Sequence, residues 1–579
     1  MAASSLLHSP SHPSRKGQTL SSIYSFHSER NGICFSFNPQ QPKCNVKLHA
    51  MTHISVTLFR AVRCFKANGS EEMHGSPKAA VVSSSVIASN NLQRSKTLLD
   101  CSSNSANTIN DLEKQLQELF VDVKIMLKAG NTDGAANLLK ANFEAVKAQV
   151  EAGAKGMVQA AKIDIIALGY MSMGDYKFVE YLLQMLNEIV GNVKNDEPFL
   201  DSVLMHMGSM YTNFGKFEEA MRSYQRGLEI LERLFGKTSP YLITPLLGIA
   251  KVYTSIRRAS KAIDFYKRAV SILEASRGAD SEDVVVPLSG LGNLLIKEGR
   301  APEAEVCFDR IVSIYSKLYG ENDGRVGMAT CSLAHAKCAK GNLDEAIQLY
   351  RKGLLAVNNS KYLDIEDEVL EKIRIDLAEL LHVAGRECEG RELLEECLLI
   401  TEKYRGNEHL SSITHILNLA TSYSRSKNYP EAERLIRTAL QIMKKSTDPL
   451  EQSITVPMLH LAVILYNLNR DEEAEHFALE AVRLREEAFG TDSLLVGEAL
   501  DCLVSIQTRL GKDDTKILIL LRRVLSIQEK EFGFENEEVM ITLQKIVFYL
   551  NRMGKKDEKL LLQRRLSRLR TMYKDKFQS

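Results

Sequence analysis

The sequence predicts an all-α fold, a right-handed superhelical solenoid of antiparallel helix pairs. Residues 202–241 carry apolar and small residues at helical spacing on both sides of a break near Asn213, which is the pattern of two amphipathic helices joined by a tight turn. The pattern repeats, because the small residue of the second helix returns every 42 residues, at Ala220, Ala262, Ala304 and Ala346. One helix pair cannot bury its own apolar face, so we expect about ten stacked pairs between residues 110 and 575.

The first 66 residues have the composition of a plastid-targeting sequence. They are rich in Ser, contain Arg and Lys but only one acid, Glu29, and so resemble a transit peptide. Pro10 and Pro13 would break the amphipathic helix of a mitochondrial presequence, which favours the chloroplast. We therefore expect residues 1–66 to be a chloroplast transit peptide that is cleaved near Cys64. The mature protein is then expected in the stroma or on the stromal face of the thylakoid.

The remaining chain is divided by composition and by helical pattern. Residues 67–108 are rich in Ser, Asn and Gly, which predicts a disordered linker. Residues 109–200 hold two helix pairs that only partly follow the later register, as terminal repeats tend to do. Residues 201–540 form the tandem 42-residue repeats, and residues 541–579 form basic capping helices. Glycines such as Gly236 follow second helices, where a left-handed C-cap is expected.

The repeat resembles a known family. Its order of small and large residues is similar to the tetratricopeptide repeat, and its length resembles the long variety found in kinesin light chains, since the usual period is about 34 residues. The residues that carry the resemblance in the first full repeat are Leu204, Met207, Gly208, Tyr211, Ala220, Tyr224 and Gly227. The resemblance implies a non-catalytic scaffold whose first helices line a groove for protein partners.

Charge separates the two ends of the chain from its middle. The net charge of the 579 residues is +1, but residues 1–70 hold eight Lys or Arg against Glu29 alone. Residues 551–579 hold ten Lys or Arg against three acids, so the repeats between these ends are acidic. Because nucleic acids are bound through basic surfaces, we expect no nucleic-acid partner.

Gly236-Lys237-Thr238 has the residue types that end a phosphate-binding loop. That loop requires its first Gly five residues before Gly236, where this chain has Leu231, and no strand precedes the tripeptide. No other arrangement of Ser, His, Cys or acidic residues suggests a catalytic centre. We therefore expect neither nucleotide binding nor enzymatic activity.

Cys331, His335 and Cys338 follow an i, i+4, i+7 spacing, which places them on one face of a helix. His382 in the next repeat is the one candidate for a fourth zinc ligand. We interpret these residues instead as part of a partner-binding helix face, and expect no metal and no cofactor.

The expected binding surface is the face of the first helices that does not pack against second helices. Counted from Leu204, the free positions lie one, five and eight to nine residues further along, and the repeat length carries them through the chain. The predicted groove residues are Met205, Ser209, Thr212, Asn213, Lys251, Thr254, Asn293, Lys297, His335, Glu379, His382, Thr421, Arg425, Tyr466 and Asn467. A trough that mixes polar and apolar residues suits an extended or helical peptide. Met205 and Ser209 stand where the resemblance would require the Lys and Asn of a clamp for chaperone tails, so that partner is not expected.

These features predict a scaffold or adaptor that binds client proteins in the chloroplast, and the resemblance favours assembly or maintenance of photosynthetic thylakoid complexes. Two alternatives stay open. A helical-repeat factor for organellar RNA processing or translation should carry Lys and Arg along its groove. A kinesin-light-chain-like cargo adaptor in the cytosol should have no functional transit peptide.

A basic cluster lies near the C-terminus. It consists of Arg564, Arg565, Arg568 and Arg570. One hypothesis is a docking patch for an acidic partner or for peripheral association with the thylakoid membrane. The alternative is that these charges only keep the last helix of the solenoid soluble.

Overall fold

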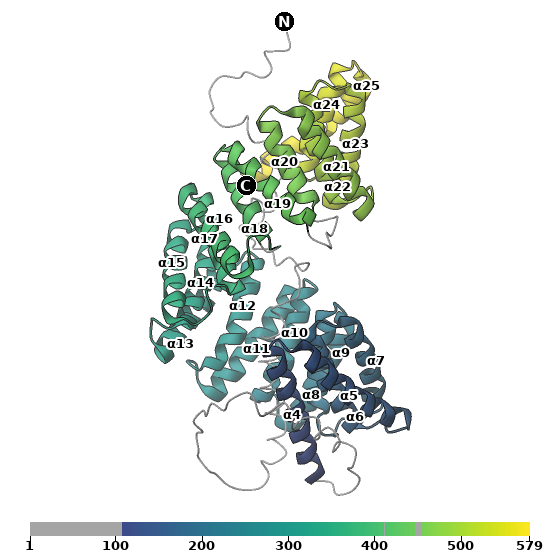
Figure 1. Cartoon of the computed structure of the whole chain (residues 1–579), viewed down its shortest axis with the longest axis vertical. Helices are drawn as coiled ribbons and strands as arrows, with labels where there is room; N and C mark the ends of the chain where they lie inside the picture. The colour runs from purple at the N-terminus through teal and green to yellow at the C-terminus, as the bar shows by residue number, and fades with distance from the viewer. Residues whose placement is uncertain (1–106, 410–411, 446–453, 579) are drawn as a thin grey trace. The chain divides into compact units, whose positions relative to one another are not determined.

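The computed structural model describes residues 107–409, 412–445 and 454–578, which form helices and short connections (Figure 1). The predicted transit peptide and nearly all of the predicted linker lie outside the described residues. Within the described residues there are no strands, and the 22 α-helices form eleven antiparallel pairs. The prediction of an all-α solenoid is confirmed.

The chain divides into two compact units, called here the N-terminal unit (107–314) and the C-terminal unit (315–578). α13 (Ala301–Tyr319) crosses the boundary. The other elements of the N-terminal unit are α4 (Asn107–Lys128), α5 (Thr132–Glu151), α6 (Met157–Met173), α7 (Tyr176–Gly191), α8 (Leu200–Asn213), α9 (Phe217–Phe235), η3 (Pro240–Leu242), α10 (Ile243–Ser255), α11 (Ala259–Arg277), η4 (Glu282–Val284) and α12 (Val285–Lys297). Those of the C-terminal unit are α14 (Gly324–Ala339), α15 (Leu343–Ser360), α16 (Glu368–Val383), α17 (Glu387–Arg405), α18 (Ser412–Arg425), α19 (Tyr429–Lys445), α20 (Thr455–Asn467), α21 (Asp471–Phe489), α22 (Leu494–Arg509), α23 (Asp514–Phe532), α24 (Glu537–Arg552) and α25 (Lys556–Gln578).

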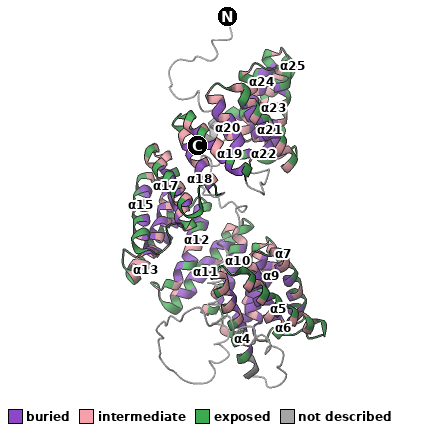
Figure 2. Ribbon diagram, in the orientation of Figure 1, coloured by how far each residue is buried: buried purple, intermediate pink, exposed green. Residues whose placement is uncertain are grey.

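The helices of the stack bury apolar stripes and expose polar ones (Figure 2). In α9 the buried side chains include Ala220, Tyr224 and Leu231, which are separated by four and seven residues and so share one face. Glu218 and Glu219 lie in the first turn of α9, where the positive end of the helix dipole stabilises negative charge. Their place at a helix start gives these acids a structural role.

Consecutive helices pack first within a pair and then against the next pair. α8 packs against α9, and α9 packs in turn against α10. The same order of contacts runs from α18 to α25. Where a second helix contacts the following first helix in this way, one pair covers the apolar face that its neighbour leaves open.

Aromatic rings from second helices fill the space beside glycines of first helices in the N-terminal unit. Tyr224 and Tyr266 are buried. A Cβ atom added at Gly248 would lie 2.4 Å from the Tyr224 ring, and one added at Gly290 would lie 2.5 Å from the Tyr266 ring. The recurrence of Gly and Tyr at the repeat length is therefore a packing requirement.

Gly236 ends α9 with φ 82° and ψ 166°. The expected left-handed C-cap is correct in the sign of φ but wrong in ψ, because the chain leaves the helix in an extended direction. Backbone with these angles is open essentially only to glycine. Lys237, the next residue, uses its carbonyl to accept a hydrogen bond from Arg268 at 3.1 Å. The tripeptide that resembled a phosphate-binding loop is thus a helix end.

An arginine of the second helix ties successive pairs together at several places. Arg268 Nη2 donates to Glu232 Oε1 at 2.5 Å as well as to the Lys237 carbonyl. We call this pairing of a carboxylate and a connector carbonyl the inter-repeat clamp. It recurs at Arg310, Arg523 and Arg565.

Candidate protein-binding surface

The predicted groove residues lie on the first helices of their pairs, and we call this side of the first helices, in either unit, the first-helix face. On α8, Ser209 and Asn213 are exposed and Thr212 is half-buried. Met205 differs from them, because only 4% of its side chain is exposed. Its Cε atom lies against Gly227, where an added Cβ would come within 2.1 Å of it. The prediction that Met205 lines the groove is corrected: its flexible side chain turns into the core and fills the space above a glycine.

Two charged residues of the first-helix face are exposed and yet partly desolvated. Lys251 on α10 is exposed, yet burial lowers the pKa of its ammonium group. Glu379 on α16 is also exposed, yet burial raises the pKa of its carboxyl group. Both charged groups are therefore in contact with water but have lost part of their hydration to neighbouring protein atoms. Asn293 and Lys297 on α12 are exposed as well.

Buried tyrosines reach the first-helix face from the second helices. Tyr224 of α9 interacts with Thr212 and Ser209 through hydrogen bonds, but burial has the larger effect and raises its pKa to about 12. Tyr266 of α11 interacts in the same way with Thr254 of α10, and burial raises its pKa too. Polar groups of the face are thus positioned by rings whose places are fixed by the glycines beside them.

Two predicted groove histidines are half-buried and neutral near pH 7. Burial lowers the pKa of His335 to about 4, and the positive charge of Lys372 acts in the same direction. Burial likewise lowers the pKa of His382 to about 4, with Arg425 as the next cause. Arg425 also opposes the rise in the pKa of Glu379. Glu379, His382 and Arg425, which the sequence placed on neighbouring repeats, therefore interact within the C-terminal unit.

Asp376 is a titratable residue beside this face that the sequence prediction missed. Burial raises its pKa to about 7, against the opposing charge of Lys372. In the repeat it occupies the position of His206, Gly248 and Gly290, and at the two glycines an added Cβ would collide with a tyrosine ring. An acid at a position that is glycine in two repeats and histidine in two others, His206 and His460, was the signal that could have identified it.

The Cys331, His335 and Cys338 side chains share a helix but do not form a metal centre with His382. Cys331 and Cys338 are buried, and burial raises the pKa of both thiols to about 12. A metal binds the thiolate, which such a pKa disfavours. Among the residues that the structure describes, no group of three or more His, Cys, Asp or Glu is arranged to hold a metal ion.

The later groove residues are partly engaged within the protein. Thr421 and Asn467 each donate a hydrogen bond to a carbonyl four residues earlier in their own helices, at 2.8 and 2.7 Å. The guanidinium carbon of Arg509 lies 3.3 Å from the centre of the Tyr466 ring, and Arg509 Nε also donates to Asp471 at 2.7 Å. A partner would therefore meet Tyr466 as a ring stacked on an arginine.

The first-helix face continues beyond the predicted residues. Ser505 on α22 lies one repeat length of 42 residues after Val463 on α20. Phe548 on α24 follows Ser505 by 43 residues, which is one more than the repeat length. Phe548 is 53% exposed. An exposed aromatic ring at a position that does not pack is typical of residues that dominate protein binding. The prediction ended at Asn467 and so missed Phe548.

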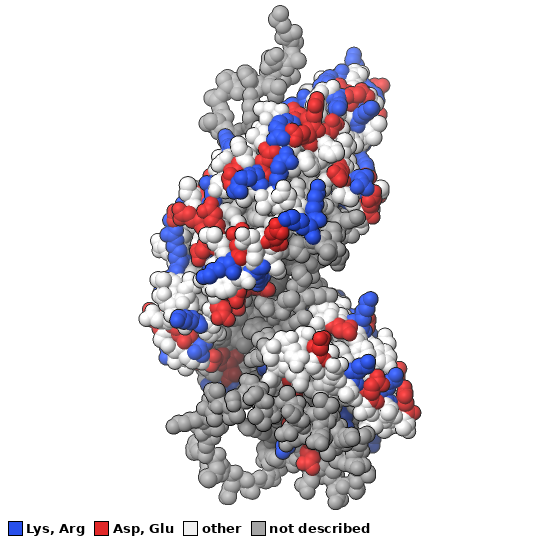
Figure 3. All heavy atoms as spheres, in the orientation of Figure 1, with Lys and Arg blue, Asp and Glu red and all other residues white. Residues whose placement is uncertain are grey.

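Lys and Arg side chains alternate with Asp and Glu on the face of the molecule shown in Figure 3. Many of them are paired, as the inter-repeat clamps illustrate. A continuous basic stripe of the kind that binds a nucleic-acid backbone is not visible in this view.

The four arginines of the C-terminal cluster differ in their surroundings. Arg565 forms an inter-repeat clamp with Glu529 Oε1 at 2.5 Å and the Phe534 carbonyl at 3.1 Å. Arg564, Arg568 and Arg570 are exposed. One member of the predicted patch is thus a packing residue, and three are available at the surface.

Two family models, both described as tetratricopeptide repeats, match the chain. One matches residues 200–275, 283–354 and 370–445, and the other matches residues 458–494. These segments begin at α8 and extend to the start of α22, and so cover most of the predicted tandem repeats. A search of curated protein sequences found no match.

Several solved structures resemble the chain. TPR-like repeats of a proposed kinesin light chain from Podosopora anserina are 22% identical, with a TM-score of 0.33 over 36% of this chain and 98% of that one. The apo form of RapI is 12% identical, with a TM-score of 0.41 over 69% of this chain and 99% of that one. The apo form of the quorum sensor NprR from B. thuringiensis is 13% identical, with a TM-score of 0.37 over 73% of this chain and 99% of that one.

Membrane-spanning segments were sought among the described helices. None of these helices combines the length and the apolar character that crossing a membrane requires.

Proposed function

Since the chain contains tetratricopeptide repeats, we propose that it is a non-catalytic scaffold that binds client proteins on its first-helix face. The observation that carries this proposal is the exposure of residues at the non-packing positions of first helices. Ser209, Lys251 and Asn293 are exposed in the N-terminal unit, and Glu379 and Phe548 are exposed in the C-terminal unit. Within each unit, stacked repeats hold such residues in a fixed register, which suits recognition of an extended or helical segment.

The C-terminal unit indicates what such a segment would contain. Glu379 is an exposed acid on α16, and Phe548 is an exposed ring on α24. A client segment with a basic residue for Glu379 and an apolar anchor for Phe548 would satisfy both. Pairing of opposite charges sets the register of the segment, while burial of the ring supplies most of the affinity.

Substitution on the first-helix face tests this proposal. Phe548→Ala should weaken capture of client proteins from a leaf extract by roughly tenfold or more, as loss of a dominant aromatic contact does. Leu399→Ala is the matched control, because Leu399 is also exposed but lies on a second helix, α17. Equal capture by the parent and the Phe548 variant, or an equal loss in the control, would refute the role of this face.

We also propose that the protein acts in the chloroplast, in assembly or maintenance of thylakoid complexes. Support comes from the Ser-rich, acid-poor composition of residues 1–66. Fusing residues 1–70 to a fluorescent reporter in plant cells tests the location, and fluorescence confined to the cytosol would contradict it. Mass spectrometry of proteins that co-purify from stromal and thylakoid fractions tests the role in thylakoid complexes.

A further inference from the structure

The C-terminal helix α25 has one side packed and one side open. Leu566 and Leu569 are each 5% exposed and belong to a core cluster with Val539 and Leu543 of α24. Leu560 and Leu561 are 55% and 72% exposed. The helix therefore uses part of its apolar surface to close the stack and leaves two leucines of its first turns in water.

The arginines of α25 are likewise divided between the packed side and the open side of the helix. Arg565 lies on the packed side and forms its inter-repeat clamp with Glu529. Arg564, Arg568 and Arg570 are exposed, and none of the three forms an ion pair or hydrogen bond with any residue described in the structure. Their charges are thus uncompensated, unlike those of the arginines in the clamps.

Helical geometry places the free arginines beside the exposed leucines. Residues four apart lie on the same side of a helix, which aligns Leu560, Arg564 and Arg568 along one stripe. Leu561 lies at one edge of this stripe and Arg570 at the other. From Lys556 to Tyr573 the helix carries six Lys or Arg against two acids, and Glu558, one of these acids, is paired with Arg522 of α23 at 2.8 Å.

We propose that this open face of α25, formed by Leu560, Leu561, Arg564, Arg568 and Arg570, docks on a membrane surface that contains anionic lipid. The unpaired guanidinium groups are attracted to the lipid headgroups, and the two leucines enter the boundary between headgroups and acyl chains. An acidic protein segment would satisfy the arginines but gives no reason for two leucines to remain exposed beside them. α25 is the second helix of its pair, so this surface contains none of the first-helix positions that we propose for client binding.

Co-sedimentation of the full chain with vesicles tests the proposal. The vesicles are made of phosphatidylcholine, with or without phosphatidylglycerol. Residues 1–70 are also basic, so the informative quantity is the difference between the parent and a variant with Arg564→Gln, Arg568→Gln and Arg570→Gln. At low salt this variant should partition onto phosphatidylglycerol vesicles roughly a hundredfold less than the parent, since each of the three basic residues near the surface contributes about a fivefold factor.

Two further variants separate docking from folding. Arg565→Gln removes a clamp and should lower the melting temperature while it leaves vesicle binding nearly unchanged. Leu560→Gln with Leu561→Gln should also weaken vesicle binding, and this loss should persist at high salt because apolar contacts are not screened. Circular dichroism of each variant checks that the helices are retained.

Two outcomes would overturn the proposal. If the triple arginine variant partitions like the parent, the charges only keep the end of the solenoid soluble. If immobilised poly-glutamate captures the parent through the same arginines while phosphatidylglycerol vesicles do not, the partner is an acidic protein.

Discussion

In the N-terminal unit, rings pack on glycines, whereas in the C-terminal unit the repeats that follow the buried Tyr350 use aliphatic contacts at the same place. Tyr224 occupies the space above Gly248. Leu394 and Ile436 stand at the equivalent second-helix positions of later repeats and pack in one cluster with small residues of the first helices, including Ala420. A pair of helices can thus be held together by an aromatic ring that packs on a glycine, or by an aliphatic side chain that packs on an alanine. The aliphatic solution leaves first-helix positions free to carry polar side chains.

The two units also differ in which titratable groups have a pKa that burial shifts. The C-terminal unit holds His335, His382 and His460, and burial lowers the pKa of all three to about 4. The N-terminal unit instead holds the half-buried Asp201 and the buried Asp164, which pairs with His206 at 2.6 Å, and burial raises the pKa of both acids. Burial disfavours the charged form in every case, but the charged form is reached at low pH for a histidine and at high pH for an acid. The units should therefore respond to acid in opposite directions.

Gly248→Val is expected to have the largest effect, because it breaks the packing of a ring on a glycine. The new side chain would collide with the Tyr224 ring, which lies 2.4 Å from an added Cβ. Over-packing of this kind costs roughly 1–3 kcal/mol, and the branched side chain adds to it. Urea denaturation should show an early loss of the N-terminal unit. The control is Asn418→Val at the equivalent position of α18, where the same measurement should change much less.

Acidification is expected to weaken the C-terminal unit selectively. For a histidine whose folded pKa is lowered, stability is complete above the unfolded pKa of about 6.5 and is lost as the pH falls toward 4. The three histidines lower the free energy of unfolding as the pH falls, and Asp376, whose pKa is raised, opposes them. The net loss between pH 7.5 and 5.5 should be roughly 2 kcal/mol. Hydrogen exchange, corrected for its intrinsic pH dependence, should show this loss in α14–α20.

The N-terminal unit serves as the internal reference for the acid response. For acids whose folded pKa is raised, stability is complete below the unfolded pKa and falls as the pH rises, so acidification should not weaken α6–α9 through Asp164 and Asp201. His335→Gln combined with His382→Gln should reduce the acid sensitivity of the C-terminal unit. Equal loss of protection in both units would show that the buried groups do not set this difference.

Arg374→Leu is expected to be neutral or to stabilise the protein by about 1 kcal/mol, despite the loss of polar contacts. Arg374 is 2% exposed and occupies a repeat position that is leucine in the N-terminal unit, as at Leu246. Its Nη1 donates to the Ile365 carbonyl at 3.2 Å, but its Nη2 has no hydrogen-bond partner among the described residues. Thermal unfolding should show the effect. Arg374→Ala, which leaves a cavity, should destabilise the protein, and a destabilised Leu variant would mean that the guanidinium is needed.

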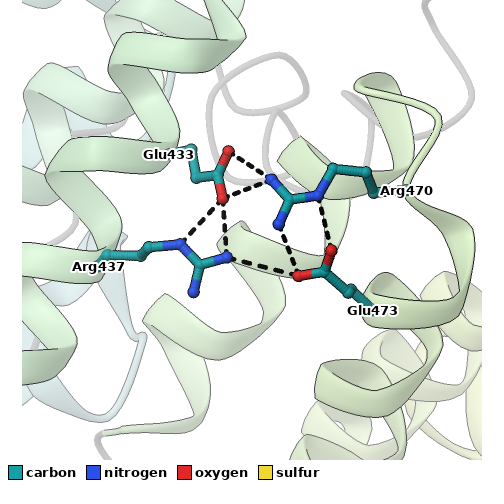
Figure 4. Close-up of polar contacts among 4 residues, drawn as sticks. All are labelled: Glu433, Arg437, Arg470 and Glu473. Carbon is teal, nitrogen blue, oxygen red and sulfur yellow. Dashed lines mark hydrogen bonds and ion pairs between the residues drawn. The ribbon is translucent and has the colours of Figure 1, made fainter.

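A smaller effect is expected from the ring of four charges between α19 and α21 (Figure 4). Arg470 bridges Glu433 at 2.8 Å and Glu473 at 2.6 Å, and Arg437 contacts Glu433 at 2.7 Å. Arg470→Ala should cost about 0.5–1 kcal/mol at low salt and less at high salt, because the pairs are partly exposed. Arg222→Ala is the control, since its single pair with Glu218 is highly exposed and should contribute nothing measurable. Similar losses in both variants would contradict a cooperative ring.

The repeat length in the sequence was sufficient to predict the helix pairs and most positions of the first-helix face. It failed where a side chain bends away from its register position, as Met205 does toward Gly227. It also failed where burial depends on a neighbouring helix: the position of Asp376 was visible, but the enclosure that raises its pKa was not. Phe548 was missed because one inserted residue shifts the register after α22. Arg565 could not be distinguished from Arg564 without knowing where Glu529 lies.

Site-specific photo-crosslinking tests the central claim, that client proteins bind the first-helix face. A benzoyl-phenylalanine would replace Asn293 or Phe548 on that face, and Val306 or Leu399 on second helices, all of which are exposed. In an extract of the source organism, the first-helix positions are expected to crosslink client proteins, and the second-helix positions are expected to give none of them. Crosslinks to those clients that form as readily from Val306 and Leu399 would contradict the account.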